Sequence, residues 1–275
     1  MQVVDAILPA RAAFGAVPRP LGFVPTMGAL HRGPLELVRA ARAACRTVAV
    51  SLFVNPLQFG PDEDFARYPR DLAGDCRQLE EAGVDLVFAP ERETMYPPGF
   101  STSVDVGEIG ARYEGAVRPG HFRGVATVVL KLLNVVRPDA LFLGQKDAQQ
   151  TAVLRRMVRD LDLDVRVEIV PTVREADGLA LSSRNAYLSA AQRAVAPTLQ
   201  RVLRELYAAL ERGDGKENAV RAARGLLDPA ATLDYLDVVD ADTFEPLDAP
   251  RAGAFVVGAA RFGQTRLLDN IWLPA

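Results

Sequence analysis

Short apolar segments alternate with longer amphipathic segments over the first 170 residues of the chain. The apolar segments are rich in β-branched residues and predict strands at 21–26, 47–54, 84–90, 139–144 and 165–170. Between them, apolar positions recur with the period of a helix and predict helices near 34–45, 71–82, 124–137 and 147–160. Apolar strands that alternate with helices indicate a parallel sheet covered on both faces. The pattern therefore predicts a doubly wound α/β domain, whose ligands bind beyond the carboxyl ends of the strands.

Two parts of the chain depart from this alternation. The segment "STSVDV" at 101–106 alternates polar and apolar residues and predicts a small hairpin or an edge excursion of the sheet. Beyond 172–176, two helical patterns within 189–227 are followed by three strand-like segments, "TLDYLDVVD", "AFVVGAARF" and "TRLLDNI". Helices followed by a meander indicate a smaller α+β domain. We predict two domains, at 1–173 and 174–275, with a hinge near 172–176.

Composition narrows the classes of partner. Hydrophobic residues make up 49% of the 275 residues, which is enough for a sizeable core. The formal net charge is −3 and the pI is near 5.6, so the chain lacks the basic excess of a nucleic-acid-binding protein. Lysine occurs only at Lys131, Lys146 and Lys216, so a lysine in a loop is a candidate for function.

The cysteines and the apolar segments indicate a cytoplasmic protein. Cys45 and Cys76 lie in helical patterns without metal-binding spacing, which favours buried free thiols in a reducing compartment. Asp5 and Arg11 interrupt the N-terminal stretch where a signal peptide needs an unbroken apolar segment. The segment "GVATVVLKLLNVV" is too short to span a membrane and contains Lys131. We therefore expect no membrane partner.

Five loops carry the candidate chemistry, and four of them directly follow a predicted strand. The first is "PTMGALHRGP" at 25–34. Gly28 and Gly33 permit a close approach of the backbone to a ligand, and the N-terminus of the following helix attracts anions. His31 could stabilise the charge that develops on a phosphate. The alternative is a structural turn in which His31 caps the helix.

The next two loops offer groups suited to polar substrates. Asn55 and Gln58 in "NPLQFG" are neutral donors and acceptors, although Asn-Pro is also an ordinary turn. The loop "RPGHFRGVAT" at 118–127 carries Arg118, His121 and Arg123 ahead of a helix. Taken alone, it fits a solvated basic loop equally well.

The last two loops offer positive charge and hydroxyl groups. In "GQKDAQQ" at 144–150, Lys146 is a candidate phosphate contact, Asp147 is a candidate N-cap, and Gln150 would face the same crevice one turn later. The alternative is a capped helix with an exposed lysine. In "LALSSRN" at 179–185, two hydroxyl groups and a guanidinium suit the oxygens of a triphosphate, or belong to a surface loop.

The motifs that the sequence lacks exclude several enzyme classes. It contains no GxxxxGK[ST] P-loop, and "GALHRG" does not match the GxGxxG fingerprint of dinucleotide-binding enzymes. No cysteine and histidine cluster has zinc spacing, and no GxSxG motif of a serine hydrolase is present. The five loops therefore need an explanation as one set.

Taken in order, the five loops resemble one known family over about 21–270. The blocks "FVPTMGALH", "VSLFVNPLQFGPDEDFARYPRDL", "RPGHFRGVATVVLKLLNVVRPD", "GQKDAQQ" and "PTVREADGLALSSRN" are similar to those of pantoate–β-alanine ligases. That family belongs to the HIGH-type nucleotidyltransferases, which have a Rossmann-like N-terminal domain. The resemblance implies that 1–173 binds ATP and pantoate and that 174–275 acts as a lid, with a mobile loop at 176–185.

The resemblance also implies a two-step ligation. Pantoate reacts with ATP to give pantoyl adenylate and pyrophosphate, and β-alanine then displaces AMP to give pantothenate. ATP is a substrate, Mg²⁺ accompanies its phosphates, and the protein is expected to be a homodimer. Positioning and charge neutralisation would supply most of the rate enhancement.

Residue roles follow from the resemblance by position. The catalytic set would be His31, Lys146 and Arg184, with Lys146 reaching the phosphates. Gln58 and Gln150 would hold pantoate, and Gln58 and Asn55 would contact β-alanine. Asp75 would contact magnesium through water, and Arg118 and His121 match a block near the phosphates. The residues expected to contact ATP are Met27, Gly28, Ala29, Leu30, His31, Arg32, Gly33, Pro34, Gly144, Gln145, Lys146, Asp147, Val173, Leu181, Ser182, Ser183 and Arg184.

Three positions depart from the family pattern. Gln145 and Ala148 replace the glutamate and tyrosine of "GEKDYQQ", and Pro34 replaces the second histidine of "HxGH". The family assigns that histidine the role of proton donor, which proline cannot perform. We expect Pro34 at the first helical position, which proline favours, after an extended Gly33. The fold should then tolerate Pro34, and the reaction should be slowed.

Two other interpretations remain open at this stage. One is a protein of the same fold that binds ATP or pantoate with little or no turnover. The other is a different nucleotidyltransferase, although Gln58 and Gln150 argue against it, because nucleotidyl transfer alone would not require both glutamines.

Overall fold

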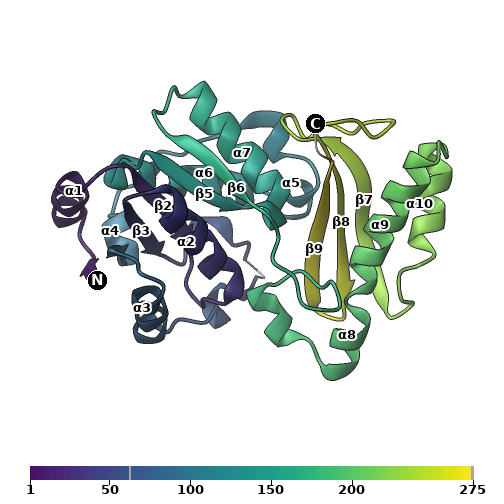
Figure 1. The fold of residues 1–275 in the computed structure, drawn as a ribbon, viewed down its shortest axis with the longest axis horizontal. Helices are drawn as coiled ribbons and strands as arrows, with labels where there is room; N and C mark the ends of the chain where they lie inside the picture. The colour runs from purple at the N-terminus through teal and green to yellow at the C-terminus, as the bar shows by residue number, and fades with distance from the viewer. Residues whose placement is uncertain (62, 274–275) are drawn as a thin grey trace. The chain divides into compact units, whose positions relative to one another are not determined.

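The structure is a computed structural model and describes residues 1–61 and 63–273. It contains two compact units (Figure 1). The N-terminal unit comprises Met1–Gly144 and Val153–Val170, and the C-terminal unit comprises Gln145–Ala152 and Pro171–Ala275. The two units are not divided at a single point of the chain, because Gln145–Ala152 belongs to the C-terminal unit although Val153–Val170 belongs to the N-terminal unit. The predicted domain limits, 1–173 and 174–275, stay a prediction.

A six-stranded parallel sheet forms the centre of the N-terminal unit (Figure 1). Its strand order is β1-β4-β3-β2-β5-β6, and each neighbouring pair is parallel. The strands are β1 (Gln2–Val4), β2 (Leu21–Thr26), β3 (Thr47–Leu52), β4 (Leu86–Phe88), β5 (Ala140–Gly144) and β6 (Arg166–Val170). The prediction of a doubly wound α/β domain is confirmed.

Alternate residues of the strands from β2 to β6 enter two separate cores, because successive side chains point to opposite faces of a sheet. Phe23 and Leu141 belong to one core, while their neighbours Val24 and Phe142 belong to the other. Helices α1, α4, α6 and α7 contribute to the first core, and α2 and α3 to the second. The helices of this part of the chain are α1 (Ile7–Gly15), α2 (Arg32–Ala44), α3 (Leu72–Glu81), α4 (Arg92–Met95), α5 (Glu114–Val117), α6 (His121–Val136) and α7 (Ala148–Asp160).

The expected hairpin at 101–106 is wrong, because these residues form no strand. The backbone N–H of Val104 donates to Thr127 Oγ1 of α6 at 2.9 Å, and Val104 and Val106 pack against the first core. The apolar residues of the alternating pattern therefore fasten a segment without strand pairing to α6 and the first core. The patterns at 1–20 predicted no element, yet β1 and α1 form there, with β1 at the edge of the sheet.

The C-terminal unit contains an antiparallel three-stranded meander, as the sequence predicts. Its strands are β7 (Ala231–Asp240), β8 (Ala254–Phe262) and β9 (Thr265–Leu273). Buried residues of α9 (Thr198–Glu211) and α10 (Lys216–Arg224) share one apolar core with these strands, and the short α8 (Ala190–Val195) precedes them. The sheet order is β7-β8-β9, so β9 is an edge strand, and the loops described below adjoin it.

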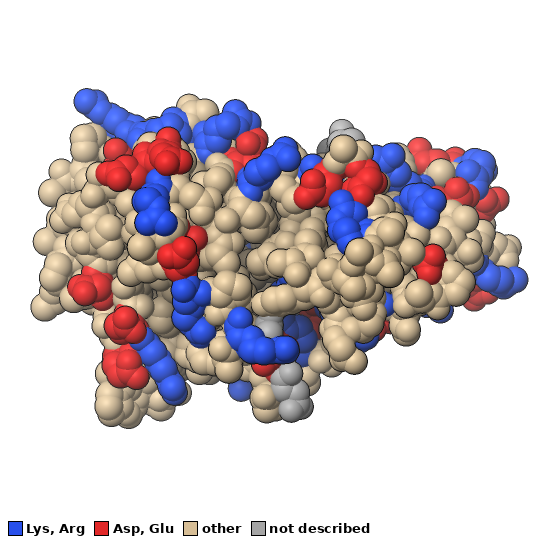
Figure 2. Space-filling view, turned by 90° about the horizontal axis from the view of Figure 1, so that it is seen from below, with Lys and Arg blue, Asp and Glu red and all other residues tan. Residues whose placement is uncertain are grey.

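The surface carries charges of both signs, and the two cysteines are free thiols, as the sequence predicts. On the face that Figure 2 draws, acidic and basic side chains are intermixed. Among the described residues, no helix combines the length and the apolar character needed to cross a membrane. Cys45 is buried and Cys76 is half-buried; both are free, and burial raises the pKa of both thiols. A raised pKa keeps a thiol protonated and unreactive at neutral pH.

Candidate functional site

The loop after β2 forms a tight turn with left-handed backbone conformations. Gly28 has φ +80° and Ala29 has φ +52°. Thr26 Oγ1 accepts a hydrogen bond from Gly28 N–H at 3.2 Å and donates one to the Ser51 carbonyl at 2.8 Å, which ties the turn to β3. Consecutive N–H groups in such a turn point the same way and form a small anion-binding concavity.

The carboxylate of Asp75 accepts hydrogen bonds from two N–H groups of this turn. Asp75 lies in α3 and is 5% exposed. Its Oδ2 accepts from Ala29 N–H at 3.0 Å and its Oδ1 accepts from Leu30 N–H at 2.9 Å. A Cβ at Gly28 would lie 2.6 Å from Asp75 Oδ2, so glycine is required there for space as well as for its φ. Asp75 therefore holds the shape of the turn, and its expected contact with magnesium stays a prediction.

Helix α2 begins earlier than the sequence indicated. His31 is the N-cap residue, with extended backbone, and its Nδ1 accepts from Gly33 N–H at 3.0 Å. Arg32 is the first helical residue, so Pro34 occupies the third helical position and the expectation of the first is wrong. Gly33 is helical, so the expectation that it would be extended is also wrong. A Cβ on Gly33 would lie 2.7 Å from His31 Cε1, so the cap needs a glycine there.

The third position still accommodates proline. The N–H groups of the first helical turn have no intrahelical acceptor, so the missing N–H of Pro34 breaks no helical hydrogen bond. The first such bond runs from Leu35 N–H to the His31 carbonyl at 3.3 Å. The prediction that the fold tolerates Pro34 therefore has a structural basis, although the position differs from the expected one.

Asn55 connects the loop after β3 to several parts of the N-terminal unit. It is 1% exposed, and its Nδ2 donates to Gln58 Oε1 at 3.0 Å and to the Gly124 carbonyl at 3.1 Å. Its Oδ1 accepts from Tyr96 Oη at 2.7 Å. Gln58 Nε2 in turn contacts Met27 Sδ at 3.0 Å, which joins this loop to the turn after β2. Nothing in the sequence pattern singles out Tyr96, because it is an isolated aromatic residue.

Arg118 and His121 hold the main chain of the loop after β3 at Gln58. The Gln58 carbonyl lies 2.8 Å from His121 Nδ1 and accepts from Arg118 Nη2 at 3.2 Å. A carbonyl only accepts, so Nδ1 carries the proton, and Nε2 accepts from Arg118 Nη1 at 3.1 Å. Arg118 Nε also donates to Glu63 at 2.7 Å. The third basic residue, Arg123, pairs with Asp105 on an exposed surface and takes no part in this cluster.

The environment of His121 keeps its ring neutral. Burial lowers the pKa of His121 to about 4, and the Arg118 guanidinium acts in the same direction. The hydrogen bond to Gln58 and the carboxylates of Glu114 and Glu63 oppose this shift and are outweighed. At neutral pH the imidazole therefore acts as a fixed hydrogen-bonding group.

Acidification is expected to destabilise the fold through His121. Between pH 4 and 6.5 the histidine of the unfolded chain binds a proton that the folded state excludes, so stability rises with pH across this window. The full shift corresponds to about 3 kcal/mol. Urea unfolding at pH 4.5 and pH 7 should show a smaller pH dependence for His121→Gln than for the unmodified protein. Equal pH dependence of the two would contradict this origin.

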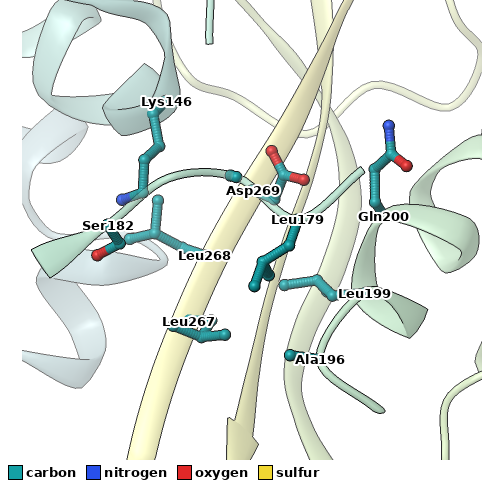
Figure 3. Close-up of a pocket in the computed structure, with 10 residues that line it drawn as sticks. Lys146, Leu179, Ser182, Ala196, Leu199, Gln200, Leu267, Leu268 and Asp269 are labelled. Carbon is teal, nitrogen blue, oxygen red and sulfur yellow. The ribbon is translucent and has the colours of Figure 1, made fainter. Parts of the chain in front are cut away.

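In the C-terminal unit, Lys146 and Ser182 line the same pocket. Gln145–Asp147 forms a 3-10 turn (η4) directly before α7, and Lys146 Nζ pairs with Asp147 Oδ1 at 3.3 Å. Figure 3 shows Lys146 and Ser182 together at this pocket, with Gln200 on the opposite side of the view. Its other lining residues are Leu179, Ala180, Ala196, Leu199, Leu267, Leu268 and Asp269.

The segment 173–181 is a short hairpin that leads to the serine loop. Leu181 N–H donates to the Val173 carbonyl at 2.9 Å, Arg174 and Ala180 form an antiparallel bridge, and Gly178 turns with φ +93°. Ser182 then caps a second 3-10 turn, η5 (Ser183–Tyr187), by accepting from Arg184 N–H at 3.3 Å. The hairpin therefore determines where Ser182, Ser183 and Arg184 lie within this unit.

The structure brings the predicted residues together as two groups. The N-terminal unit groups the turn around Gly28 with Asn55, Gln58, Arg118 and His121. The C-terminal unit groups Lys146 with Ser182 around one pocket, and Gln150 is half-buried in α7. Sequence reasoning missed the polar pair at 269–270, which occurs within the otherwise apolar "LLDNI" of a predicted strand and could have been noticed for that reason.

A parallel α/β sheet, with a left-handed glycine turn leading into a helix at the end of the central strand β2, is typical of nucleotide-binding α/β proteins. The sequence pattern of the family described as pantoate–beta-alanine ligase matches residues 2–272. The chain belongs to the pantoate–β-alanine ligase family and is an enzyme of the ligase class. The resemblance inferred from the sequence is thereby confirmed.

Individual relatives agree over their whole length. The chain is 55% identical to a protein named pantothenate synthetase from Acidiphilium cryptum, over 98% of this chain and 99% of the relative. A solved pantothenate synthetase from Thermus thermophilus is similar with a TM-score of 0.95 and 52% identity, and the match covers 100% of both chains. A Francisella tularensis pantoate–beta-alanine ligase, solved with "Beta-gamma ATP" and beta-alanine, has a TM-score of 0.81 and 33% identity over 99% of this chain and 97% of that one.

Proposed function

We propose that the protein ligates pantoate and β-alanine to pantothenate through a pantoyl-adenylate intermediate, releasing AMP and pyrophosphate. One observation carries the proposal beyond family membership. Gln58 Nε2 contacts Met27 Sδ at 3.0 Å, so the amide expected to hold pantoate adjoins the turn expected to hold ATP. The first reaction step requires this arrangement, because a carboxylate must reach the α-phosphorus of ATP.

In the first step, a carboxylate oxygen of pantoate forms a bond to the α-phosphorus, and the bond from that phosphorus to the bridging oxygen of pyrophosphate breaks. Gln58 and Gln150 hold pantoate by hydrogen bonds in this proposal. The turn residues and the N-terminus of α2 surround the phosphates, and His31, Lys146 and Arg184 stabilise the negative charge on the phosphoryl oxygens.

In the second step, the neutral amine of β-alanine attacks the acyl carbon of the adenylate, AMP leaves, and the new ammonium loses a proton. Asn55 and Gln58 orient β-alanine in this proposal. Asn55 acts in this proposal through Gln58, because its amide is buried, is held by Gly124 and Tyr96, and donates to Gln58 Oε1.

We propose that magnesium enters with ATP and is held mainly by the phosphate oxygens and water. Among the described residues, no group of three or more histidine, cysteine, aspartate or glutamate side chains is arranged to hold a metal ion. Asp75 has both carboxylate oxygens engaged by backbone N–H groups, so it suits a role in shaping the turn better than direct metal binding. The expected homodimer and cytoplasmic location stay predictions.

Pro34 favours one alternative, a protein that binds the nucleotide or pantoate with little turnover. A steady-state assay with ATP, pantoate and β-alanine distinguishes the two. We expect AMP and pantothenate to form in equal amounts, and their formation to require all three substrates. ATP binding without any AMP release would reject ligase activity and favour the binding protein.

A further inference from the structure

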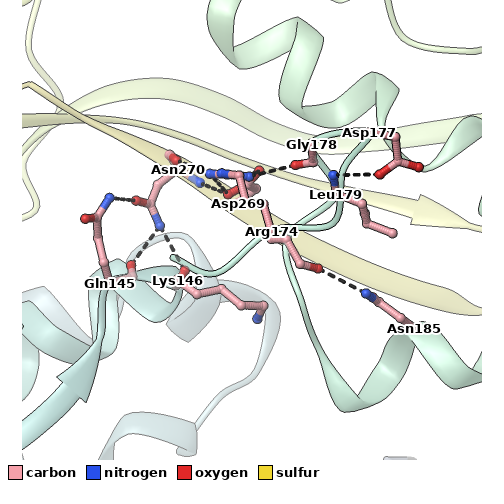
Figure 4. A network of polar contacts seen from close by, with 10 residues as sticks. Gln145, Lys146, Arg174, Asp177, Gly178, Leu179, Asn185, Asp269 and Asn270 are labelled. Carbon is pink, nitrogen blue, oxygen red and sulfur yellow. Dashed lines mark hydrogen bonds and ion pairs between the residues drawn. The ribbon is translucent and has the colours of Figure 1, made fainter. Parts of the chain in front are cut away.

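Two consecutive buried polar residues interrupt the apolar strand β9. Asp269 is 5% exposed and Asn270 is 1% exposed, and both lie within the C-terminal unit. Neighbouring side chains in a strand point to opposite faces, so the two residues can hold two different segments. Figure 4 shows that each contacts a segment expected to handle phosphate.

Asn270 holds the main chain of η4. Its Nδ2 donates to the Gln145 carbonyl and to the Lys146 carbonyl, both at 2.9 Å, and its Oδ1 accepts from Gln145 Nε2 at 3.1 Å. Carbonyl groups only accept, so these partners define the orientation of the amide. Both N–H donors and the acceptor oxygen of one buried side chain are thus used to place the backbone that carries Lys146.

Asp269 holds the hairpin at 173–181. Its carboxylate forms a bidentate pair with Arg174, with distances of 2.6 and 2.9 Å. The same guanidinium donates to the Gly178 carbonyl at 3.0 Å and to the Asn270 carbonyl at 3.2 Å. Arg174 therefore links the base and the turn of the hairpin to β9, and the hairpin leads directly to Ser182.

We propose that Asp269 and Asn270 are positioning residues for ATP, which set the places of Lys146 and of Ser182–Arg184 relative to each other. This proposal rests on the proposed function. Asn270 acts on Lys146 through the main chain of η4, and Asp269 acts on Ser182 through Arg174 and the hairpin. Lys146 and Ser182 line one pocket, so an error in either segment alters the spacing of the groups around it.

The test compares Asn270→Ala and Asp269→Asn with a control, Val256→Ala. Val256 is fully buried in β8 of the same unit, so its truncation lowers stability without touching either segment. The measurements are the Kd for ATP, the single-turnover rate of pyrophosphate release with pantoate, and the reaction of supplied pantoyl adenylate with β-alanine. Thermal unfolding establishes that each variant is folded at the assay temperature.

We expect both site variants to weaken ATP binding and slow pyrophosphate release by about tenfold or more. The reaction of supplied adenylate with β-alanine should change much less, since pyrophosphate has already left. Val256→Ala should match the unmodified protein in all three. Variants that remain folded with unchanged ATP affinity and unchanged rates would overturn the proposal, as would an equal loss in both half-reactions.

The ATP affinity separates this proposal from the proposed function. If the unmodified protein binds ATP but forms no pantothenate, ligase activity is rejected, and the positioning role is still decided by the Kd of the two variants. Asp269→Asn keeps the size of the side chain, so it supplies a result if Asn270→Ala does not fold.

Discussion

Replacing Pro34 with histidine is expected to raise the single-turnover rate of pantoyl-adenylate formation by about 10²–10³, the usual effect of one preorganised donor at a developing charge. Pro34 lies at the third position of α2, two residues beyond the N-terminal helical residue and within the anion-attracting first turn. A histidine there would supply both a backbone N–H and an imidazole N–H. Rapid-quench measurement of pyrophosphate release with saturating ATP and pantoate gives the rate.

Pro34→Ala is the matched control for this prediction. Alanine restores the backbone N–H and supplies no acid, so it isolates the contribution of the side chain. We expect Pro34→Ala to gain much less than Pro34→His. If the two variants have the same rate, the missing imidazole is not what slows the reaction.

Removing the Asp75 carboxylate is expected to lower ATP affinity by about 10² and to destabilise the N-terminal unit by about 2–4 kcal/mol, because two part-buried backbone N–H groups lose their acceptors and the turn loses its shape. Asp75→Ala tests this through the Kd for ATP and the urea midpoint. Asp75→Asn keeps the size of the side chain but offers only one acceptor oxygen. Its Kd for ATP and its urea midpoint should therefore lie between those of the unmodified protein and of Asp75→Ala.

Asp71→Ala is the control on the same helix. Asp71 caps α3 by accepting from Gly74 N–H at 2.9 Å and is exposed, so its loss should cost about 1 kcal/mol and leave ATP affinity unchanged. A magnesium titration separates positioning from metal binding. An unchanged magnesium midpoint in Asp75→Asn supports positioning, and a large shift in that midpoint with a normal urea midpoint would contradict it.

The elements with strong local periodicity could be predicted from the sequence. The expected strand at 21–26 coincides with β2 (Leu21–Thr26), and "AFVVGAARF" coincides with β8 (Ala254–Phe262). The first four residues of β2 and all but one residue of β8 are buried, so most of their residues carry the apolar signal. The segment 101–106 misled because an alternating pattern reports only that one side is buried, and here the burial is against α6 and the first core.

The candidate loops could be named from the sequence, because four of the five directly follow a predicted strand and they carry residue types with few other uses. The roles of their residues stay predictions. The exact positions of the loop residues within the following helices could not be predicted from the sequence. The start of α2 depends on which residue caps it. The sequence offered a capping His31 only as an alternative, and in the structure His31 is the N-cap, through a close approach to Gly33. Pro34 therefore occupies the third helical position, where the sequence predicted the first.

The sequence by itself determined the fold class and the family, since periodicity, glycine turns and motif order are local properties of the chain. It also named the candidate site residues, whose roles stay predictions. Only the tertiary structure decided what holds those residues in place. Asp75 reaches a turn 46 positions away, and Asn270 reaches Lys146 across 124 positions. Such contacts depend on how distant segments pack, and a single sequence contains no local signal of which buried polar group will meet which backbone.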